Sequence, residues 1–421
     1  MNPILPRNYF VPDVEARVMP DGRLYIYGSF DALNSNVYCS YEYHVFSTDD
    51  PTLTNWVDHG VSFTNTVEQP GLPWLPGELL WAPDAIHKDG KYYLYACSAG
   101  DGEVVAVSDK PYGPFTDSKR VVGADGDGID PAIFVDDDGQ AYYFWGQFSL
   151  RGAKLKDDMC TVDQDSLVYG VLTEQEHGFH EGASIRKING KYYLVYTDIT
   201  RGKATCLSYA ISDSPLGPYK RCGVIVDNMY CDPYTWNDHG SICEFKGQWY
   251  IFYHRSSQNS NLNRRVCVEP ITINADGTIN EVCMTSQGPA GPINAFETID
   301  ASIACRMRCS LYIKNEHPEA DVANEVLVEC GGGNFKDAWA EYKYIDFGDG
   351  VSSCKFNVRG KGVIELRVDG SDDVIGAVEI DGGEGFNEYT MKITKETRGV
   401  HALWVFFKGK GMALDSFCFE K

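Results

Sequence analysis

Residues 89–97 read DGKYYLYAC, a turn followed by alternating aromatic and aliphatic side chains, and this stretch decides the fold because it recurs. A Gly after a polar residue suits a hairpin turn, and the run that follows suits a strand. The pattern begins at five glycines: Gly22 (GRLYIYGS), Gly90 (GKYYLYACS), Gly139 (GQAYYFWGQ), Gly190 (GKYYLVYTD) and Gly247 (GQWYIFYHR). Their intervals of 68, 49, 51 and 57 residues indicate a β-unit that repeats about every 50 residues.

A second motif keeps the same period. AVSDKPYGPF around Asp109 returns as AISDSPLGPY around Asp213, which lies 104 residues, or two units, later. A lone four-stranded unit cannot bury both of its faces, so units of this size stack around an axis as the blades of a propeller. The sequence therefore predicts an all-β chain in which residues 1–285 form a five-bladed β-propeller.

The Tyr-rich motif does not return after residue 285. Residues 286–295 belong to a Gly/Pro-rich stretch without periodicity, which predicts a linker. Beyond it, residues 296–421 alternate in polarity, with Cys354, Phe356 and Val358 on one face of a predicted strand. We expect these residues to form an antiparallel β-sandwich of the jelly-roll type.

Composition limits the classes of function. The 421 residues carry 37 Lys and Arg against 60 Asp and Glu, a net charge of −23, which disfavours nucleic acid or an anionic membrane and favours a neutral polar partner. No apolar run is long enough to span a bilayer and no apolar signal core follows Met1, so a soluble cytoplasmic protein is expected. The fourteen cysteines include no CxxC, and we expect all of them to be thiols.

The repeat also serves as a ruler for functional residues. Counting back nine residues from the five glycines gives Asp13, Trp81, Asp130, Glu181 and Asp238, with His239 next to the last. The innermost strands of a propeller line its central channel, so equivalent positions converge on one funnel. Three carboxylates from three blades are therefore expected to face one another, namely those of Asp13, Asp130 and Glu181.

Two kinds of chemistry use such a group of acids. Glycoside hydrolysis needs a carboxylic acid that protonates the leaving oxygen and a carboxylate that activates water or attacks, and a third acid can tune the pKa of the first. Alternatively, three carboxylates and His239 could hold Ca²⁺, which would make the propeller a sugar-binding protein without catalysis. Both interpretations stay open at this point.

Four further residues are candidates for contact with a sugar. Trp81 occupies the funnel register and offers a flat face to a sugar ring, although core packing explains it equally well. His239 could be a core residue, a sugar contact or an ion ligand. Arg264 and Arg265 follow the hairpin of the fifth unit, where one guanidinium could reach a sugar hydroxyl while the other lies at the surface. The sequence does not choose between these two.

Residues 1–285 resemble glycoside hydrolase family 43, the five-bladed propeller enzymes of arabinan and xylan breakdown. The resemblance rests on an ordered set of motifs, FVPDVEA, LWAPDAIHKDGKYYLY, GIDPAIFVDDDGQAYYFWG, HEGASIRKINGKYYLVYT and HGSICEFKGQWYIFYHR. It implies that Asp13 is the general base, Glu181 the general acid, and Asp130 the residue that orients the acid and modulates its pKa. Val14 departs from the family pattern, which usually has Pro directly after the base.

The same resemblance implies that Trp81 lines the sugar pocket and that His239 lies near the channel centre, where in some members it helps to hold a calcium ion. Residues 296–421 resemble a family 6 carbohydrate-binding module, in which Glu297 and Asp415 would help to bind a structural Ca²⁺. The sugar-binding features of that module are weaker here, because GGEGFNEY places Phe386 where the family usually has Trp.

The implied activity is that of an inverting exo-glycosidase that releases terminal α-L-arabinofuranosyl or β-D-xylosyl units from oligosaccharides of hemicellulose or pectin. Endo-arabinanase or galactan-cleaving activity is the alternative within this chemistry, because loops at the funnel mouth set specificity. The chemistry requires no cofactor, and an oligosaccharide is the expected partner.

Overall fold

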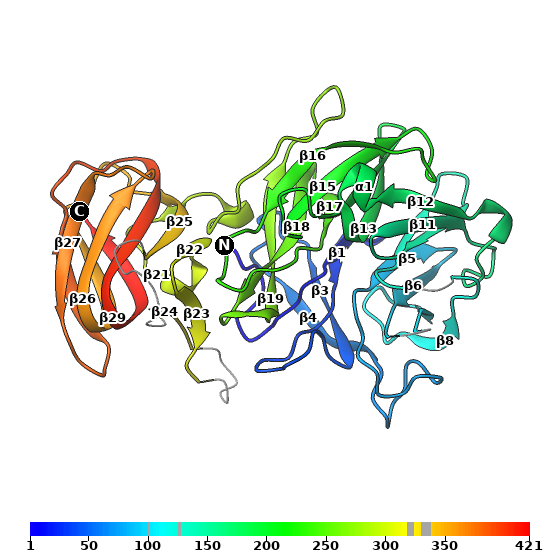
Figure 1. Cartoon of the computed structure of the whole chain (residues 1–421), viewed down its shortest axis with the longest axis horizontal. Coiled ribbons are helices and arrows are strands. Elements are labelled where there is room, and N and C mark those ends of the chain that lie inside the picture. Colours follow the sequence, from blue (N-terminus) through cyan, green and yellow to red (C-terminus); the bar gives the residue numbers. More distant parts are fainter. Residues whose placement is uncertain (100–101, 125–127, 318–323, 330–337) are drawn as a thin grey trace.

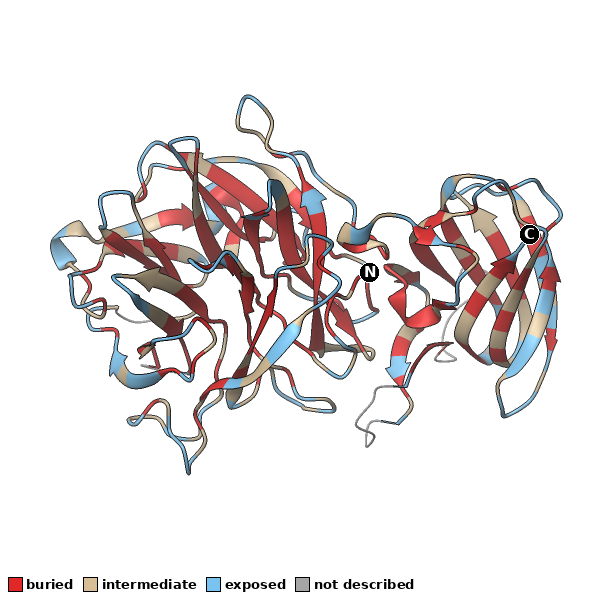
Figure 2. Cartoon of the chain, turned by 180° about the vertical axis from the view of Figure 1, so that it is seen from behind, coloured by how far each residue is buried: buried red, intermediate tan, exposed pale blue. Residues whose placement is uncertain are grey.

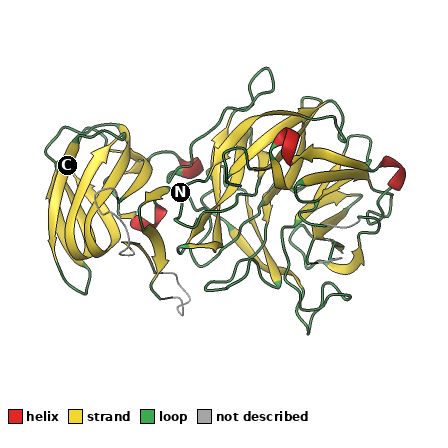
Figure 3. Cartoon of the chain, viewed as in Figure 1, coloured by secondary structure: helices red, strands yellow, loops and turns green. Residues whose placement is uncertain are grey.

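The computed structural model of the chain describes residues 1–99, 102–124, 128–317, 324–329 and 338–421. Within these ranges the regular secondary structure is almost entirely strand, apart from one short helix and three 3₁₀ turns: α1 (Glu174–His177), η1 (Gln164–Ser166), η2 (Gly288–Ala290) and η3 (Ala301–Ile303). Figure 1 shows a large ring of sheets beside a smaller domain built by the C-terminal part of the chain, and Figure 3 shows how few helices there are. The predicted all-β class is confirmed.

The ring is a five-bladed propeller, as predicted. Four blades have four antiparallel strands each: β1 (Glu15–Val18), β2 (Leu24–Tyr27), β3 (Glu42–Thr48) and β4 (Val57–Thr64); β5 (Asp84–Lys88), β6 (Lys91–Ala96), β7 (Val104–Ser108) and β8 (Thr116–Arg120); β9 (Ala132–Val135), β10 (Ala141–Trp145), β11 (Ser149–Lys154) and β12 (Val168–Thr173); β13 (Phe179–Ile188), β14 (Lys191–Asp198), β15 (Cys206–Ser212) and β16 (Lys220–Asp227). The fifth blade has three strands: β17 (Ser241–Phe245), β18 (Gln248–Ser257) and β19 (Ser260–Ile271).

The first residues of the chain run along the outer strand of the fifth blade. The backbone N–H of Ile4 donates to the carbonyl of Val266 at 3.2 Å. The Asn2 side chain donates to the Val268 carbonyl at 3.0 Å and accepts from the Val268 N–H at 2.9 Å. The N-terminal segment thus lies along β19 before the chain enters β1. This pairing joins the first blade to the last.

The five repeat glycines stand at the turn between the first two strands of each blade. Their φ angles lie between 76° and 85°, a left-handed conformation in which a residue with a Cβ is strained. The tyrosines that follow are buried between neighbouring blades, for example Tyr95 and Tyr143 between the second and third, and Tyr193 and Tyr253 between the fourth and fifth. The Tyr-rich repeat is therefore the packing layer that holds the blades together.

The described residues of the C-terminal domain form ten strands joined in one hydrogen-bonded network: β20 (Ile293–Asn294), β21 (Ile299–Asp300), β22 (Arg306–Arg308), β23 (Leu311–Asn315), β24 (Glu325–Glu329), β25 (Trp339–Asp346), β26 (Ser353–Val368), β27 (Val374–Asp381), β28 (Asn387–Lys392) and β29 (Val400–Glu420). The long strands β26 and β29 pair along most of β26, and their register shifts next to Val358 and Arg359. Bends of this kind let one sheet fold over into two layers. The predicted β-sandwich is confirmed.

Buried and exposed residues alternate along the strands of this domain, as Figure 2 shows. Cys354, Phe356 and Val358 are fully buried, on the single face that the sequence pattern predicted. The segment expected as a linker, 286–295, contains the 3₁₀ turn η2 and strand β20, and β20 pairs in parallel with β25. Part of that segment thus belongs to the C-terminal sheet.

Thirteen of the fourteen cysteines lie in the described ranges, and all thirteen are free thiols, while Cys330 lies outside these ranges. Among the described residues there is no helix with the length and apolar character that crossing a membrane requires.

Candidate active site

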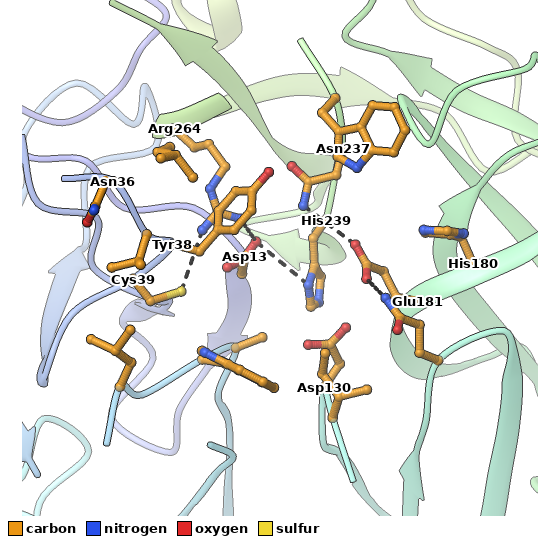
Figure 4. Close-up of a pocket in the computed structure, with 18 residues that line it drawn as sticks. Asp13, Asn36, Tyr38, Cys39, Asp130, His180, Glu181, Asn237, His239 and Arg264 are labelled. Atoms are coloured by element: carbon orange, nitrogen blue, oxygen red, sulfur yellow. Dashed lines mark hydrogen bonds and ion pairs between the residues drawn. The ribbon is translucent and has the colours of Figure 1, made fainter. Parts of the chain in front are cut away.

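A cavity of about 560 Å³ receives residues from all five blades. Asp13, Trp81, Asp130, Glu181 and His239 all line it, and four of them were located by counting nine residues back from a glycine. Figure 4 shows the three carboxylates and His239 around one space. The expected convergence of these residues is therefore observed. Asp238, the fifth residue in that count, is buried and does not line the cavity.

Asp13 directly precedes the first blade and is held by a dense set of donors. Its Oδ1 accepts a hydrogen bond of 2.9 Å from Nη1 of Arg264, and its Oδ2 accepts one from the Ser29 hydroxyl. Burial alone would raise the pKa of Asp13, but Arg264 above all, with His239 and the Ser29 hydrogen bond, lowers it below its usual value. Asp13 is therefore an ionised carboxylate, which is what a base must be.

His254 contacts both the backbone and the carboxylate of Asp13 as a neutral ring. Its Nδ1 lies 3.4 Å from the Asp13 backbone N–H, which donates to it, and 3.5 Å from Oδ1. Burial, with the nearby charge of Arg264, lowers the pKa of His254 to about 3. The ring therefore accepts from the Asp13 backbone and fixes its position.

Asp130 occupies the matching place before the third blade. Both acids adopt a left-handed backbone, with φ of 57° at Asp13 and 55° at Asp130, which is uncommon for residues other than Gly and concentrates at functional sites. Asp130 Oδ2 accepts a hydrogen bond of 3.0 Å from the backbone N–H of Gly182, next to Glu181. Burial raises the pKa of Asp130 to about 7, with His239 opposing the rise and the charges of Glu181 and Asp13 adding to it.

Glu181 lies in β13 and is only partly buried, so it is open to the cavity. Its Oε2 accepts a hydrogen bond of 2.7 Å from the side-chain amide of Gln147, and its Oε1 accepts a longer one of 3.5 Å from Asn237. Because the Gly182 amide binds Asp130, the backbone beside Glu181 is fixed relative to that second acid. The arrangement presents one accessible carboxyl group next to a buried carboxyl whose pKa is raised.

Arg264 links Asp13 to a further buried acid. Its Nε and Nη2 donate to the two oxygens of Asp31, each at 2.9 Å, while Nη1 reaches Asp13. The Tyr38 ring packs over the guanidinium at 4.8 Å. Burial raises the pKa of Asp31, although Arg264 opposes the rise. Arg264 thus carries one positive charge between two carboxylates and fixes the direction of Asp13.

Residues 1–279 match the model of the glycosyl hydrolases family 43, and residues 328–421 match that of the carbohydrate binding module family 6. The chain belongs to glycosyl hydrolase family 43. As a family 43 member it is a glycoside hydrolase, so the predicted enzyme class is confirmed.

Several relatives of this family 43 chain span its full length or its propeller. A xylosidase/arabinosidase of Thermoclostridium stercorarium is 33% identical over 99% of this chain and 98% of that protein. The structure of an arabinoxylan arabinofuranohydrolase of family 43 from Bacillus subtilis is 26% identical, with a TM-score of 0.55 that covers 100% of this chain and 97% of the other. CoXyl43, a β-xylosidase/α-arabinofuranosidase from a compost microbial metagenome, is 32% identical with a TM-score of 0.57 over 67% and 97% of the two chains.

The prediction that Arg265 contacts the sugar is wrong. Arg265 does not line the cavity, because adjacent residues of a strand point to opposite faces and its neighbour Arg264 points inward. Nor does Arg265 lie at the surface, since it is buried against Glu325 of the C-terminal domain. Trp81 does line the cavity and is partly buried.

The expected calcium ligands stay a prediction. Glu297 is exposed and accepts from the Asn294 side chain at 3.2 Å, and Asp415 accepts from Asn357 at 2.9 Å. Within the described ranges no three or more His, Cys, Asp or Glu side chains group so that they could hold a metal ion. These two acids alone fall short of the six to eight oxygen ligands that Ca²⁺ takes, so backbone carbonyls or water would have to supply the rest.

Sequence reasoning missed the residues that support the acids, although the repeat contains a signal for them. Seven residues after each repeat glycine stand Ser29, Cys97, Gly146, Thr197 and His254. Cys97 accepts from the backbone N–H of Asp130 at 3.4 Å, Thr197 donates to the Asp238 carbonyl, and His254 accepts from Asp13. In these three cases a residue of one blade holds the acid that begins the next. A second count along the same repeat would have located this layer.

Proposed function

We propose that this enzyme is an inverting exo-glycosidase that removes terminal α-L-arabinofuranosyl or β-D-xylosyl units. One observation carries the proposal: a single cavity holds an ionised carboxylate, Asp13, opposed to an accessible carboxyl, Glu181, with Asp130 beside the latter. Single-displacement hydrolysis of a glycoside requires this division between a base and an acid.

In the proposed reaction, the sugar occupies the cavity with its anomeric carbon between Asp13 and Glu181. A water molecule on the Asp13 side attacks that carbon and gives its proton to the Asp13 carboxylate. The bond to the leaving oxygen breaks, and Glu181 donates a proton to that oxygen. The product sugar keeps the oxygen of water on the face opposite to the bond that was cleaved, so its configuration is inverted.

The sugar specificity rests on size, lining and relatives. A volume of about 560 Å³ is within the usual range of small-molecule sites and has room for a sugar. The walls include Trp81, Leu79 and Ile129, which suit the apolar face of a sugar. The polar side chains of the cavity, such as Gln147 and Asn237, lie beside the carboxylates. The names of the relatives, xylosidase/arabinosidase and arabinoxylan arabinofuranohydrolase, support pentose release.

The leaving group is proposed to rest on the rim beside Glu181. Trp236 lines the cavity and keeps 49% of its surface exposed. Phe148, also 49% exposed, packs edge-on against the ring of His180, which lines the cavity next to Glu181. Such flat, exposed rings suit the next sugar of an oligosaccharide.

A panel of nitrophenyl glycosides tests this function, with α-L-arabinofuranoside, β-D-xyloside and β-D-galactofuranoside as the substrates. We expect turnover of one or both pentosides and loss of turnover on all of them in Asp13→Asn, because no group then deprotonates water. Proton NMR of the first product should show the inverted anomer. No hydrolysis of any glycoside in the panel, or a product that retains its configuration, would contradict the proposal.

Two further expectations stay proposals. We propose that the enzyme works where thiols are kept reduced, as in the cytoplasm, and the thirteen free cysteines support this. We also propose that Glu297 and Asp415 take part in a structural Ca²⁺ site, which the resemblance to the family 6 module supports.

A further inference from the structure

The last hairpin of the propeller faces two parts of the molecule at once. In β18 and β19, His254, Val266 and Arg264 point toward the first blade and the cavity. The alternate residues Arg255 and Arg265, which are paired across the hairpin, point to the opposite side. Neighbouring residues of one strand, Arg264 and Arg265, therefore enter two different environments.

On the opposite side the C-terminal domain holds this hairpin at several points. Both Nη atoms of Arg265 bind the carboxylate of Glu325 in β24, and both side chains are nearly fully buried. At the hairpin tip, the Gln258 backbone N–H donates to the Ile313 carbonyl at 2.9 Å. Its side chain donates to Glu325 at 2.6 Å and accepts from the backbone N–H of Asn315 at 2.7 Å. Glu325 thus binds both Gln258 at the hairpin tip and Arg265 in β19.

The stretch of the hairpin between these contacts builds one wall of the cavity. Leu262 and Arg264 line the cavity, and Arg264 donates to Asp13. Asn261 donates to the hydroxyl of Tyr38, which also lines it, and Asn263 donates to the Ala32 carbonyl at 3.2 Å. Every residue from 261 to 264 therefore has a contact in or beside the site.

Nothing in the propeller replaces Glu325 as the carboxylate partner of Arg265 among the contacts of the described residues. The other acceptor of the guanidinium is the backbone carbonyl of Arg7, at 2.7 Å from Nη2. A buried guanidinium that loses its carboxylate moves toward water or a new partner, because an uncompensated buried charge is costly. The two arginines are adjacent in β19, so a shift of that strand at Arg265 would also shift Arg264.

We propose that the C-terminal domain positions the catalytic base of the propeller, with Glu325 as a positioning residue that acts through Arg265 and Arg264. This inference rests on the proposed role of Asp13 as base. It gives the C-terminal domain a task in catalysis that is separate from any binding of sugar.

The test compares Glu325→Gln in the full-length enzyme with a second interdomain contact, Arg7→Gln. Arg7 forms an ion pair with Asp300 of the C-terminal domain, about one third exposed, and its contact with Arg265 is made by the backbone carbonyl, which Arg7→Gln retains. Asp13 is faced by Arg264, His239 and His254, and by the acids Asp31, Asp130 and Asp238, all of which both variants retain. Any change in the acid limb of the kcat/KM profile therefore reports the placement of these groups.

We expect Glu325→Gln to move the acid limb of kcat/KM upward by about one pH unit and to lower kcat by about tenfold with a smaller change in KM. Arg7→Gln should change both quantities by less than about twofold, as a partly exposed pair contributes little. Glu325→Asp should restore part of the loss. An unchanged acid limb in Glu325→Gln, or an equal shift in Arg7→Gln, would overturn the proposal.

If Glu325→Gln does not fold, Arg265→Lys is judged by the same criterion, since it removes the paired contact of the two Nη atoms with Glu325 and keeps the positive charge. Asp13→Asn separates the two proposals. If that variant retains activity, the role of Asp13 fails, whatever Glu325 does. If Asp13→Asn is inactive and the acid limb of Glu325→Gln is unchanged, only the positioning role fails.

Discussion

Replacing Arg264 by Gln should move the acid limb of the pH–rate profile to higher pH. The Nη1 atom of Arg264 lies 2.9 Å from Oδ1 of Asp13, and both side chains are buried, so the charge acts through little water. An opposite charge this close lowers the pKa of a carboxylate by about one to three units. Without it, Asp13 should bind a proton more readily, and the acid limb of kcat/KM should rise by a similar amount.

The same substitution should destabilise the fold. Arg264 compensates two buried carboxylates, Asp13 and Asp31, and breaking a buried pair by removing one partner costs about 3–5 kcal/mol. The loss has a pH dependence whose sign follows from linkage. Without Arg264 the folded-state pKa values of both acids rise, so the variant loses stability as the pH increases above their unfolded value of about 4. Its deficit should therefore be largest at neutral pH and smaller near pH 4.

The assay is kcat/KM for nitrophenyl α-L-arabinofuranoside or xyloside from about pH 4 to pH 9, with urea unfolding at both ends of that range. Arg221→Gln is a matched control, because Arg221 pairs with the buried Asp198 at 2.8 Å in the fourth blade, outside the cavity. The control should lose stability without moving the acid limb. An acid limb that stays in place in Arg264→Gln would refute the idea that Arg264 keeps Asp13 ionised.

Three other predictions concern the second acid, its neighbour and the metal. Glu181→Gln should slow poor leaving groups far more than activated aryl glycosides, which need less protonation, and equal losses on both would contradict its role as acid. Asp130→Asn should move the alkaline limb of kcat/KM downward, since a negative charge beside the acid is lost, and an unchanged limb would restrict Asp130 to hydrogen bonding. Ca²⁺ added after chelation should raise the melting temperature of the parent and not of Asp415→Asn, and no rise in the parent would exclude the calcium site.

The blades and the funnel residues were predictable because one short repeat carries both kinds of information. Gly90 and its four equivalents mark hairpins, and a fixed offset from a hairpin leads to the inner strand of each blade, which located Asp13, Asp130 and Glu181. Such counting works only where the same number of residues separates the hairpin from the equivalent position in every blade. It fails for side chains that come from loops of variable length, such as Tyr38.

The choice between Arg264 and Arg265 shows a second limit. The two are adjacent in a strand, so exactly one face of that strand meets the cavity, yet nothing in NRRVCVEP says which face it is. The register of β18 and β19 shifts between Ser256 and Ser257, and this irregularity sets the phase of the residues that follow. The partner of Arg265 was equally hidden, because Glu325 lies 60 positions away in another domain.

The residues around each acid, among them those seven positions after a repeat glycine, explain why the pKa values of Asp13 and Asp130 shift in opposite directions. Asp13 meets a hydroxyl from Ser29 and the ring of His254, and Arg264 adds a positive charge, so its pKa falls. Asp130 meets the thiol of Cys97 at its backbone and has no cation bonded to its carboxylate among the described contacts, so burial dominates and its pKa rises to about 7.

Glu181 completes this comparison, because the third blade offers no side chain at the equivalent place. Gly146 stands there, seven residues after Gly139, and the carboxylate of Glu181 is held instead by the neutral amide of the next residue, Gln147, at 2.7 Å and by the more distant amide of Asn237 at 3.5 Å. A neutral donor can bind the carboxyl group in both of its protonation states, whereas a guanidinium favours only the ionised one. In the proposed mechanism, the base that must stay ionised therefore has Arg264 beside it, and the acid that gains and loses a proton in each cycle has Gln147.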